Sequence, residues 1–407
     1  MSGITDPTDH ESSSSHAWPK LRYETCPWVR DTEQIASRRT KLAASGDYSA
    51  SIPAYITSKT PALQLDVQAH VDDASQALTR FDAEMGAIAA PFVGILLRTE
   101  SASSSEIEHL TSSAKQGALA EVGASTSSNA KLVVANVRAM NSALELAENL
   151  DETAIVRMHE ALLHESPPDL TGRYRDQQVW IGGGSFSPHQ ATFVPPHHDR
   201  VAELMHDLVS FMRRVDIPVL SHAAIAHAQF ETIHPFPDGN GRTGRALIHS
   251  MLKRGELTKN VAVPVSAGLL SNTDRYFEAL TAYREGDIAQ IVTVLADAAF
   301  LAVTNGRNLV QDLTAARQAW DESITARKGS AASRMKDMLL KQPVVSVKIV
   351  QEQLSISQPV AQQAIDRFVD SGILVKTNSA KRNRFWAALE VLAALDEFGR
   401  RARRQRV

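Results

Sequence analysis

The sequence of 407 residues contains one cysteine, few aromatic residues (6%) and no apolar run near the roughly 20 residues that span a bilayer. Cys26 alone can form no disulfide within the chain, and a reducing compartment is the simplest setting for such a protein. The N-terminus lacks a basic region followed by an apolar stretch, so it does not look like a secretory signal. These absences predict a cytoplasmic protein without a membrane partner.

Charge is unevenly distributed along the chain. The net charge is −3, yet residues 331–407 hold 14 Lys and Arg against 7 Asp and Glu, a balance of +7. Hydrophobic residues make 43% and charged residues 22%, as in ordinary globular proteins, and the length exceeds what one core usually holds. We therefore expect two or three domains, the last of them basic. A solvated basic tail over 400–407, which carries five arginines, is the simpler alternative.

The first 130 residues divide into an arm and a helical region. Residues 1–60 are rich in Ser, Thr and Pro, and we expect a partly disordered arm whose apolar residues, such as Trp18, dock on a later core. Residues 61–130 are expected to be helical, because apolar residues recur at helical spacing from Leu65 to about Leu97. Residues 101–113 are dense in serine and would ordinarily be assigned to a loop.

Residues 131–326 are predicted to form a mostly helical core, and residues 331–399 a second unit. Within the core, two short β-favouring runs around Gly182-Gly183-Gly184 predict a hairpin over 178–194. Helical spacing is found at about 130–147, 153–163, 201–212, 219–233, 241–254, 272–284 and 286–326. In the second unit, the order typical of a winged helix is found: helices at 333–340, 347–354 and 359–371, then strands at 374–376 and 384–386.

The segment from Ile233 to Ile248 carries the chemistry. It places His234 at the end of an apolar helix, then a glycine-rich turn, then a new helix that begins near Gly241. A helix N-terminus presents unpaired N–H groups and a partial positive charge, which attract phosphate. Gly239, Gly241 and Gly244 let the backbone approach that anion closely.

Side chains of the same segment suit a polyphosphate and a metal ion. Arg242 and Arg245 are three residues apart, so they share a helix face and present two guanidinium groups. Asp238 is a hard carboxylate of the kind that Mg²⁺ uses beside substrate phosphates. His234 can take a proton from an attacking hydroxyl at neutral pH.

This segment resembles the motif of the Fic (filamentation induced by cAMP) family, His-x-Phe-x-(Asp/Glu)-Gly-Asn-Gly-Arg-x-x-Arg. The positions that match are His234, Phe236, Asp238, Gly239, Asn240, Gly241, Arg242 and Arg245. The resemblance implies that His234 is the general base, that Asp238 binds Mg²⁺ and that Phe236 anchors the loop. It also implies that Asn240 and neighbouring amides hold the α-phosphate side of ATP, while Arg242 and Arg245 hold the β- and γ-phosphates.

The hairpin over 178–194 resembles the target-binding flap of the same family. That flap pairs with an extended segment of the target protein and aligns its hydroxyl, which is a general recognition mode. The resemblance implies that the flap is formed by Val179, Trp180, Ile181 and Gly182. A plain surface hairpin is the alternative.

The serine-dense segment resembles the inhibitory helix of Fic proteins that restrain themselves in cis, whose pattern is (Ser/Thr)-x-x-x-Glu-(Gly/Asn). Ser104 and Glu108 fit this pattern, and His109 stands where Gly or Asn is expected. The resemblance implies that Glu108 pairs with Arg245 and occupies the place of the γ-phosphate. Glu106 would face elsewhere on the helix and have little effect. A solvated acidic turn is the alternative.

Two groups of histidines suggest a metal site, but neither has the right spacing. His159 and His164 are five residues apart, so they point to different helix faces. His197, His198 and His206 have no cysteine or carboxylate at ligand spacing. We expect a surface or core role for them.

Together these features predict a mostly α Fic fold with a C-terminal winged helix. The expected activity is that of a protein adenylyltransferase, which moves AMP from ATP onto a Ser, Thr or Tyr hydroxyl of a target protein or of itself. One alternative is a Fic enzyme that transfers another phosphate-containing group or removes AMP. Another is a transcriptional regulator that uses the core as a nucleotide sensor and binds DNA. Its phosphate contacts would come from the arginine tail and from Lys376, Lys381, Arg382 and Arg384. A homodimer is also left open.

Overall fold

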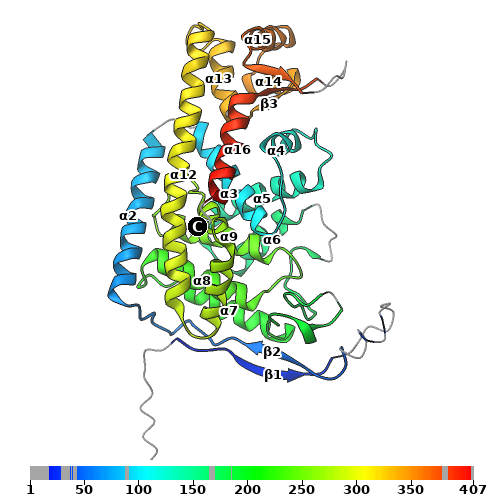
Figure 1. The fold of residues 1–407 in the computed structure, drawn as a ribbon, viewed down its shortest axis with the longest axis vertical. Helices are drawn as coiled ribbons and strands as arrows, with labels where there is room; N and C mark the ends of the chain where they lie inside the picture. Colours follow the sequence, from blue (N-terminus) through cyan, green and yellow to red (C-terminus); the bar gives the residue numbers. More distant parts are fainter. Residues whose placement is uncertain are drawn as a thin grey trace, which may run out of the picture.

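The computed structural model describes residues 18–28, 37, 39, 44–87, 91–164, 170–184, 186–377 and 384–404. This part of the chain is mostly helical, which confirms the expected fold class. The longest helices run along the long axis of the molecule in Figure 1, with strands drawn near its two ends.

The N-terminal arm contains an antiparallel pair of strands, β1 (Arg22–Cys26) and β2 (Tyr48–Ile52), at the lower end of Figure 1. The sequence analysis predicted no strands there. Trp18 docks on the core as expected, and it is buried with its ring centroid 6.4 Å from that of Phe211 and 6.1 Å from that of Tyr283. The arm was predicted to be partly disordered, and residues 1–17 of it lie outside the described residues.

Three helices follow the arm: α2 (Leu65–Ala87), α3 (Pro91–Ile107) and α4 (Ala114–Glu121). The serine-dense segment is helical up to Ile107, as its resemblance to an inhibitory helix implied and unlike the loop that its composition alone would suggest. Ser101 Oγ donates to the Leu97 carbonyl and Ser105 Oγ to the Ser101 carbonyl, at 2.9 and 2.8 Å. Bonds of this kind satisfy a hydroxyl within its own helix, and these serines can therefore be buried.

The core helices agree with the expected ranges to within about two residues. They are α5 (Ser128–Glu145), α6 (Glu152–Leu162), α7 (Val201–Met212), α8 (Val219–Ile233), α9 (Asn240–Arg254), α11 (Thr273–Arg284) and α12 (Ile288–Ser323). α10 (Val265–Leu270) was not predicted, because six residues are too few to show a helical repeat. Short 3₁₀ turns occur at Ala147–Asn149, Pro188–Gln190 and His198–Arg200. α8 is buried along almost its whole length, so the site at its end is held by a rigid centre.

The 36-residue helix α12 is long and apolar enough to cross a membrane by length and composition. The sequence analysis noted no such stretch. In the structure, α12 packs against α2, α8, α10 and α11, and most of its apolar residues are buried. Burial on several sides is what a core helix requires, and it accounts for the apolar composition.

The C-terminal unit contains α13 (Ala331–Lys341), β3 (Val344–Val345), α14 (Val347–Leu354), α15 (Gln358–Asp370), β4 (Leu374–Lys376) and β5 (Trp386–Ala388). The three strands form an antiparallel sheet in the order β3-β5-β4. The helices and the last two strands lie where the sequence placed them, while β3 was not expected. The interpretation of this unit as a winged helix stays a prediction.

A final helix, α16 (Leu389–Arg404), leaves the sheet and returns to the core, where it packs against α12, α10, α4 and α3 (Figure 1). The predicted basic tail was therefore wrong for residues 400–404, which form the last turns of this helix. Arg400, Arg401 and Arg403 are paired with Glu397, Asp312 and Glu106. These arginines neutralise acids of the same chain.

Candidate active site

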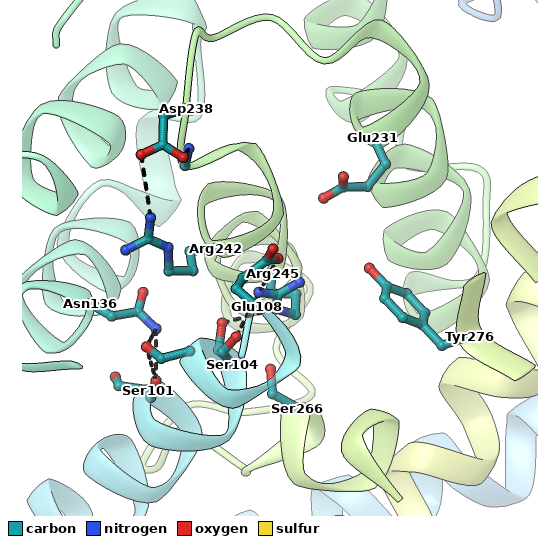
Figure 2. A network of polar contacts seen from close by, with 12 residues as sticks. Ser101, Ser104, Glu108, Asn136, Glu231, Asp238, Arg242, Arg245, Ser266 and Tyr276 are labelled. Atoms are coloured by element: carbon teal, nitrogen blue, oxygen red, sulfur yellow. Dashed lines mark hydrogen bonds and ion pairs between the residues drawn. The ribbon is translucent and has the colours of Figure 1, made fainter. Parts of the chain in front are cut away.

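The predicted motif connects two packed helices. α8 ends at Ile233, His234 follows in the left-handed region (φ 52°), and Gly239, also left-handed (φ 76°), precedes the first turn of α9. Glycine adopts this conformation without strain, whereas histidine rarely does. The expected order of helix, glycine-rich turn and helix is confirmed. Figure 2 shows the polar side chains that gather around the start of α9.

Side-chain contacts fix the shape of the loop. Asn240 Oδ1 accepts from the Phe236 N–H, and Asn240 Nδ2 donates to the Phe236 carbonyl, both at 2.8 Å. Phe236 is fully buried and stacks on His159 with ring centroids 3.8 Å apart. Phe236 thus anchors the loop, as expected. The side chain of Asn240 is already used, so a phosphate contact by Asn240 would have to come from its backbone N–H.

Arg175 secures the strained residue His234. Its Nε donates to the His234 carbonyl at 2.8 Å and its backbone N–H to the Pro235 carbonyl at 2.9 Å. Its Nη2 donates to the Pro196 carbonyl at 2.6 Å. Burial lowers the pKa of Arg175 to about 10, which still leaves the guanidinium charged at neutral pH. These contacts hold the left-handed turn in place.

The imidazole of His234 is held in its neutral form. Burial, followed by the guanidinium groups of Arg175 and Arg284, lowers the pKa of His234 to about 4. Glu231 lies one helical turn earlier, with Oε2 4.0 Å from His234 Nδ1. Burial raises the pKa of Glu231 to about 7, although Arg245 acts in the opposite direction. A neutral imidazole can accept a proton, which is what a general base must do.

Arg242 offers hydrogen-bond donors that the described residues do not use. Its side chain is 6% exposed, and its Nε and Nη1 are buried without a partner in that part of the chain. Its Nη2 lies 3.9 Å from Asp238 Oδ2. Buried N–H groups without partners are rare in folded proteins. An anion at the N-terminus of α9 would supply the missing acceptor.

Arg245 bonds to α3 and to Glu108, which directly follows it. Its Nε donates to Ser104 Oγ at 2.9 Å, and its Nη2 donates to the Ser104 carbonyl at 2.7 Å and to Glu108 Oε1 at 2.9 Å (Figure 2). The predicted pairing of Glu108 with Arg245 is confirmed. Burial alone would raise the pKa of Glu108, but Arg245, Arg242 and His234 outweigh it and lower that pKa. Glu108 is therefore a carboxylate.

The carboxylate of Glu108 occupies the start of α9. A Cβ added to Gly241 would lie only 2.0 Å from Glu108 Oε1. The close approach that the sequence assigned to phosphate at Gly241 is thus made by Glu108. Gly244 has a different role, since a Cβ there would meet Glu231 Oε1 at 2.7 Å and Phe230 at 2.9 Å. Glycine at position 244 thus permits close packing of α9 on α8, and the contact of Gly244 with ATP stays a prediction.

His109 follows α3 and Glu108 in the left-handed region, with φ 60°. The backbone N–H of Leu110 donates back to the Ser105 carbonyl at 3.0 Å, which closes the end of the helix. Such helix ends favour Gly or Asn. The resemblance expected one of these residues at this position, and the backbone supplies the physical reason.

A histidine cluster departs from the sequence analysis. His197 Nδ1 and His198 Nε2 lie 3.3 and 3.6 Å from the carboxylate oxygens of Asp199. A carboxylate is therefore within reach of these two histidines, contrary to expectation. The side chain of Asp199 is 80% exposed, so the group lies at the surface.

The predicted flap is smaller than expected. Among the described residues, the hairpin is reduced to one bridge between Ile181 and Phe193. Gly182 adopts φ 76°, and a Cβ there would meet Thr192 Oγ1 at 2.4 Å, so the turn depends on glycine. Ile181 is 37% exposed. Of the other flap residues, Trp180 packs at 5.6 Å against Trp28 of the arm, and Val179 is partly buried.

Three residues at this site were missed in the sequence. Glu231 stands three positions before His234, a spacing that places both on one helix face. His159 was considered only as a metal ligand. Arg175 has no local signal, because its partners are backbone carbonyls that only the fold brings together.

Comparison with known families supports the motif. Residues 149–252 match the Fic/DOC family. This region of the chain matches a Fic domain. The chain is 31% identical over 146 residues to "Protein adenylyltransferase Fic" of Drosophila erecta and 30% identical over 168 residues to "Protein adenylyltransferase fic-1" of Caenorhabditis elegans. These alignments cover 35% and 40% of this chain, and only 26% and 30% of the two relatives.

The fold has a structural counterpart. A crystal structure of a Fic family protein from Desulfovibrio desulfuricans G20 superposes with a TM-score of 0.53 at 22% sequence identity. The superposition covers 80% of this chain and 97% of that protein. It therefore extends well beyond the matched family region and shows a shared fold.

Proposed function

We propose that this chain is a protein adenylyltransferase that moves AMP from ATP to a hydroxyl of a protein, and that Glu108 restrains it in cis. The observation that carries the proposal is the contact of Glu108 with Arg245 and Gly241 at the start of α9. A helix N-terminus with two arginines suits a polyphosphate. A carboxylate of the same chain there would compete with ATP.

The described residues fit the parts that the reaction needs. The target hydroxyl attacks the α-phosphorus, the bond to the β-phosphate oxygen breaks, and pyrophosphate leaves while His234 takes the hydroxyl proton. Asp238 is 66% exposed beside Arg242. One of its oxygens accepts from the Gly239 N–H, so the other can face a ligand. Asp238 would hold Mg²⁺, which neutralises phosphate charge when bound.

The flap would align the target protein. The bridge between Ile181 and Phe193 gives a short, exposed extended segment near the motif loop. An extended peptide could add to such a segment through backbone hydrogen bonds. The arm supports it from behind, since Tyr48 donates to Gln178 at 3.0 Å and Trp28 packs on Trp180.

Restraint follows from competition for one guanidinium. Arg245 is 1% exposed and uses its donors on Ser104 and Glu108. A γ-phosphate can reach Arg245 only if Glu108 leaves. ATP bound with its γ-phosphate displaced would hold the α-phosphorus out of line with the attacking hydroxyl. Wild-type activity should then be low.

The test compares self-labelling and target labelling by radiolabelled ATP and Mg²⁺ in three variants. Glu108→Gly should raise labelling about 10- to 100-fold, the value of one charge-assisted hydrogen bond. Glu285→Gly is the matched control, because Glu285 also follows directly on a helix and is exposed. It should leave labelling unchanged. Adding His234→Ala to Glu108→Gly should abolish labelling while ATP still binds. Equal labelling by wild type and Glu108→Gly would contradict the restraint.

The regulator alternative receives less support. Three of the arginines expected to contact DNA are paired with acids of the chain, and Arg384 donates to Gln362 at 3.3 Å. Lys381, Arg382 and Arg406 lie outside the described residues. Bound within the fold, the paired arginines are less available for phosphates.

A further inference from the structure

A second cavity lies on the other side of α3 from the phosphate site. Its volume is about 540 Å³, within the range of small-molecule sites. α3 lines it with Arg98, Ala102 and Glu106, which follow one another at helical spacing. Ser104 and Glu108 follow Ala102 and Glu106 by two residues each, and they face Arg245 instead. The inhibitory helix therefore separates the cavity from the candidate active site.

The floor of the cavity is apolar. α5 contributes Val133 and Val137, and α16 contributes Leu395 and Phe398. An apolar surface of this kind gains free energy when it is covered by hydrocarbon instead of water. The body of a fitting ligand is therefore apolar.

Most charges around the cavity already have buried or local partners. Arg98 Nε lies 2.6 Å from Glu121 Oε1, and Asp396 accepts from the Ala114 N–H at 3.0 Å. At the rim, Glu106 and Arg403 form a two-point ion pair in which Arg403 is 49% exposed. Arg400 lies beside it, 51% exposed and paired with Glu397. An anion reaching this rim would meet two exposed guanidinium groups, and it would compete with Glu106 for Arg403 and with Glu397 for Arg400.

We propose that this cavity binds a small amphipathic anion, with a hydrocarbon body of about eight carbons and one charged head, and that the head displaces Glu106 from Arg403. The exchange conserves charge, because one carboxylate replaces another on the same guanidinium. Glu106 is two residues before Glu108. A consequence, which rests on the proposed function, is that the released end of α3 holds Glu108 less firmly on Arg245.

Binding is tested on the full chain by calorimetry, with octanoate as the probe and 1-octanol as its neutral counterpart. Octanoate should bind once per chain and about tenfold more tightly than octanol. Arg403→Gln should remove that preference and leave octanol binding unchanged. Equal affinity of the two probes for the wild type would overturn the proposal.

The location is tested by filling the cavity. Gly117 lines it, and a Cβ there meets nothing within 4 Å, so Gly117→Trp should block octanoate without a backbone clash. Gly94→Trp is the matched control, because Gly94 is also helical with open space beside it but does not line the cavity. Unchanged octanoate affinity in a folded Gly117→Trp places the probe elsewhere and refutes the site. If that variant does not fold, Arg403→Gln decides.

The coupling has its own readouts. Octanoate should speed hydrogen exchange of the backbone at 103–110 and raise self-labelling by the wild type. Glu108→Gly already lacks the restraining carboxylate, so it should bind octanoate without any further rise in labelling. Binding of octanoate without faster hydrogen exchange would refute the coupling to Glu108, while the proposed binding site would stand. Absence of labelling even in Glu108→Gly would refute the proposed function, whereas calorimetry would still report on the cavity.

Discussion

His234 combines a rare backbone conformation with a side chain that is only 20% exposed. A left-handed non-glycine residue costs roughly 1–2 kcal/mol, and here Arg175 offsets that cost through bonds to the carbonyls of His234 and Pro235. The same turn brings the imidazole next to Glu231 and away from water. The left-handed turn at His234 thus accounts both for its backbone strain and for the surroundings that lower the pKa of its imidazole.

The pH dependence of transfer should reveal this neutral imidazole. In Glu108→Gly, with folding checked by circular dichroism, the labelling rate should change less than about twofold from pH 8 to pH 5, because a base with a pKa of about 4 stays deprotonated there. Removing Glu108 does not raise that pKa, since its carboxylate favours the charged form. A histidine titrating at about 6.5 would instead lose about thirtyfold by pH 5. A fall centred near pH 6.5 would contradict the buried neutral base.

Sequence reasoning at this scale succeeded where one side chain acts through its own chemistry. Phe236, Arg245 and Glu108 lie as the motif and its resemblance implied. It failed where a residue acts through neighbours distant in the chain. The packing of Gly244 on α8, which demands glycine, was not foreseen beside its expected phosphate contact. Glu106 faces away from Arg245, as expected, but its partner Arg403 on the last helix was not foreseen.

At the scale of elements, α3 was expected from the resemblance and not from its composition. Serine clusters usually favour loops, since their hydroxyls compete for backbone groups. In α3 the hydroxyls bond within the helix or to partners on α9, and Asn136 of α5 donates to the Ser101 carbonyl at 2.8 Å. Local composition could not show this, because the polar partners lie on other helices.

His109→Gly should stabilise the end of α3. Glycine relieves the left-handed strain, which we expect to raise the free energy of unfolding by up to about 1 kcal/mol. If Glu108 restrains the enzyme, a firmer helix end should also lower wild-type labelling. Thermal melting and labelling are measured together. His206→Gly is the control for loss of a histidine, because His206 lies exposed within a helix, where glycine should lower the melting temperature. A destabilised His109→Gly would show that the imidazole makes contacts worth more than the strain.

At the scale of the whole molecule, the charge asymmetry has an explanation that the sequence did not supply. The excess positive charge of residues 331–407 was assigned to a tail or to DNA. In the structure α16 returns to the core, and its arginines meet acids on α12 and α3. Helix periods could be read from the sequence, but the side on which the last helix docks depends on long-range contacts, which no local pattern contains.

This docking predicts that Arg401 stabilises the fold and that Arg404 does not. Arg401 donates to Asn305 Oδ1 at 2.8 Å and to Asp312 at 3.0 Å, and it is 24% exposed. Arg401→Ala should lower the free energy of unfolding by about 1–2 kcal/mol, since it leaves the buried amide of Asn305 and the carboxylate of Asp312 without this partner. Arg404, exposed on the same helix, is the matched control, and Arg404→Ala should be neutral. The stability of both variants is measured by thermal melting and by hydrogen exchange in α12 and α16. Equal melting of the two variants would show that α16 is held by its apolar face alone, through Val391, Ala394, Phe398 and Ala402.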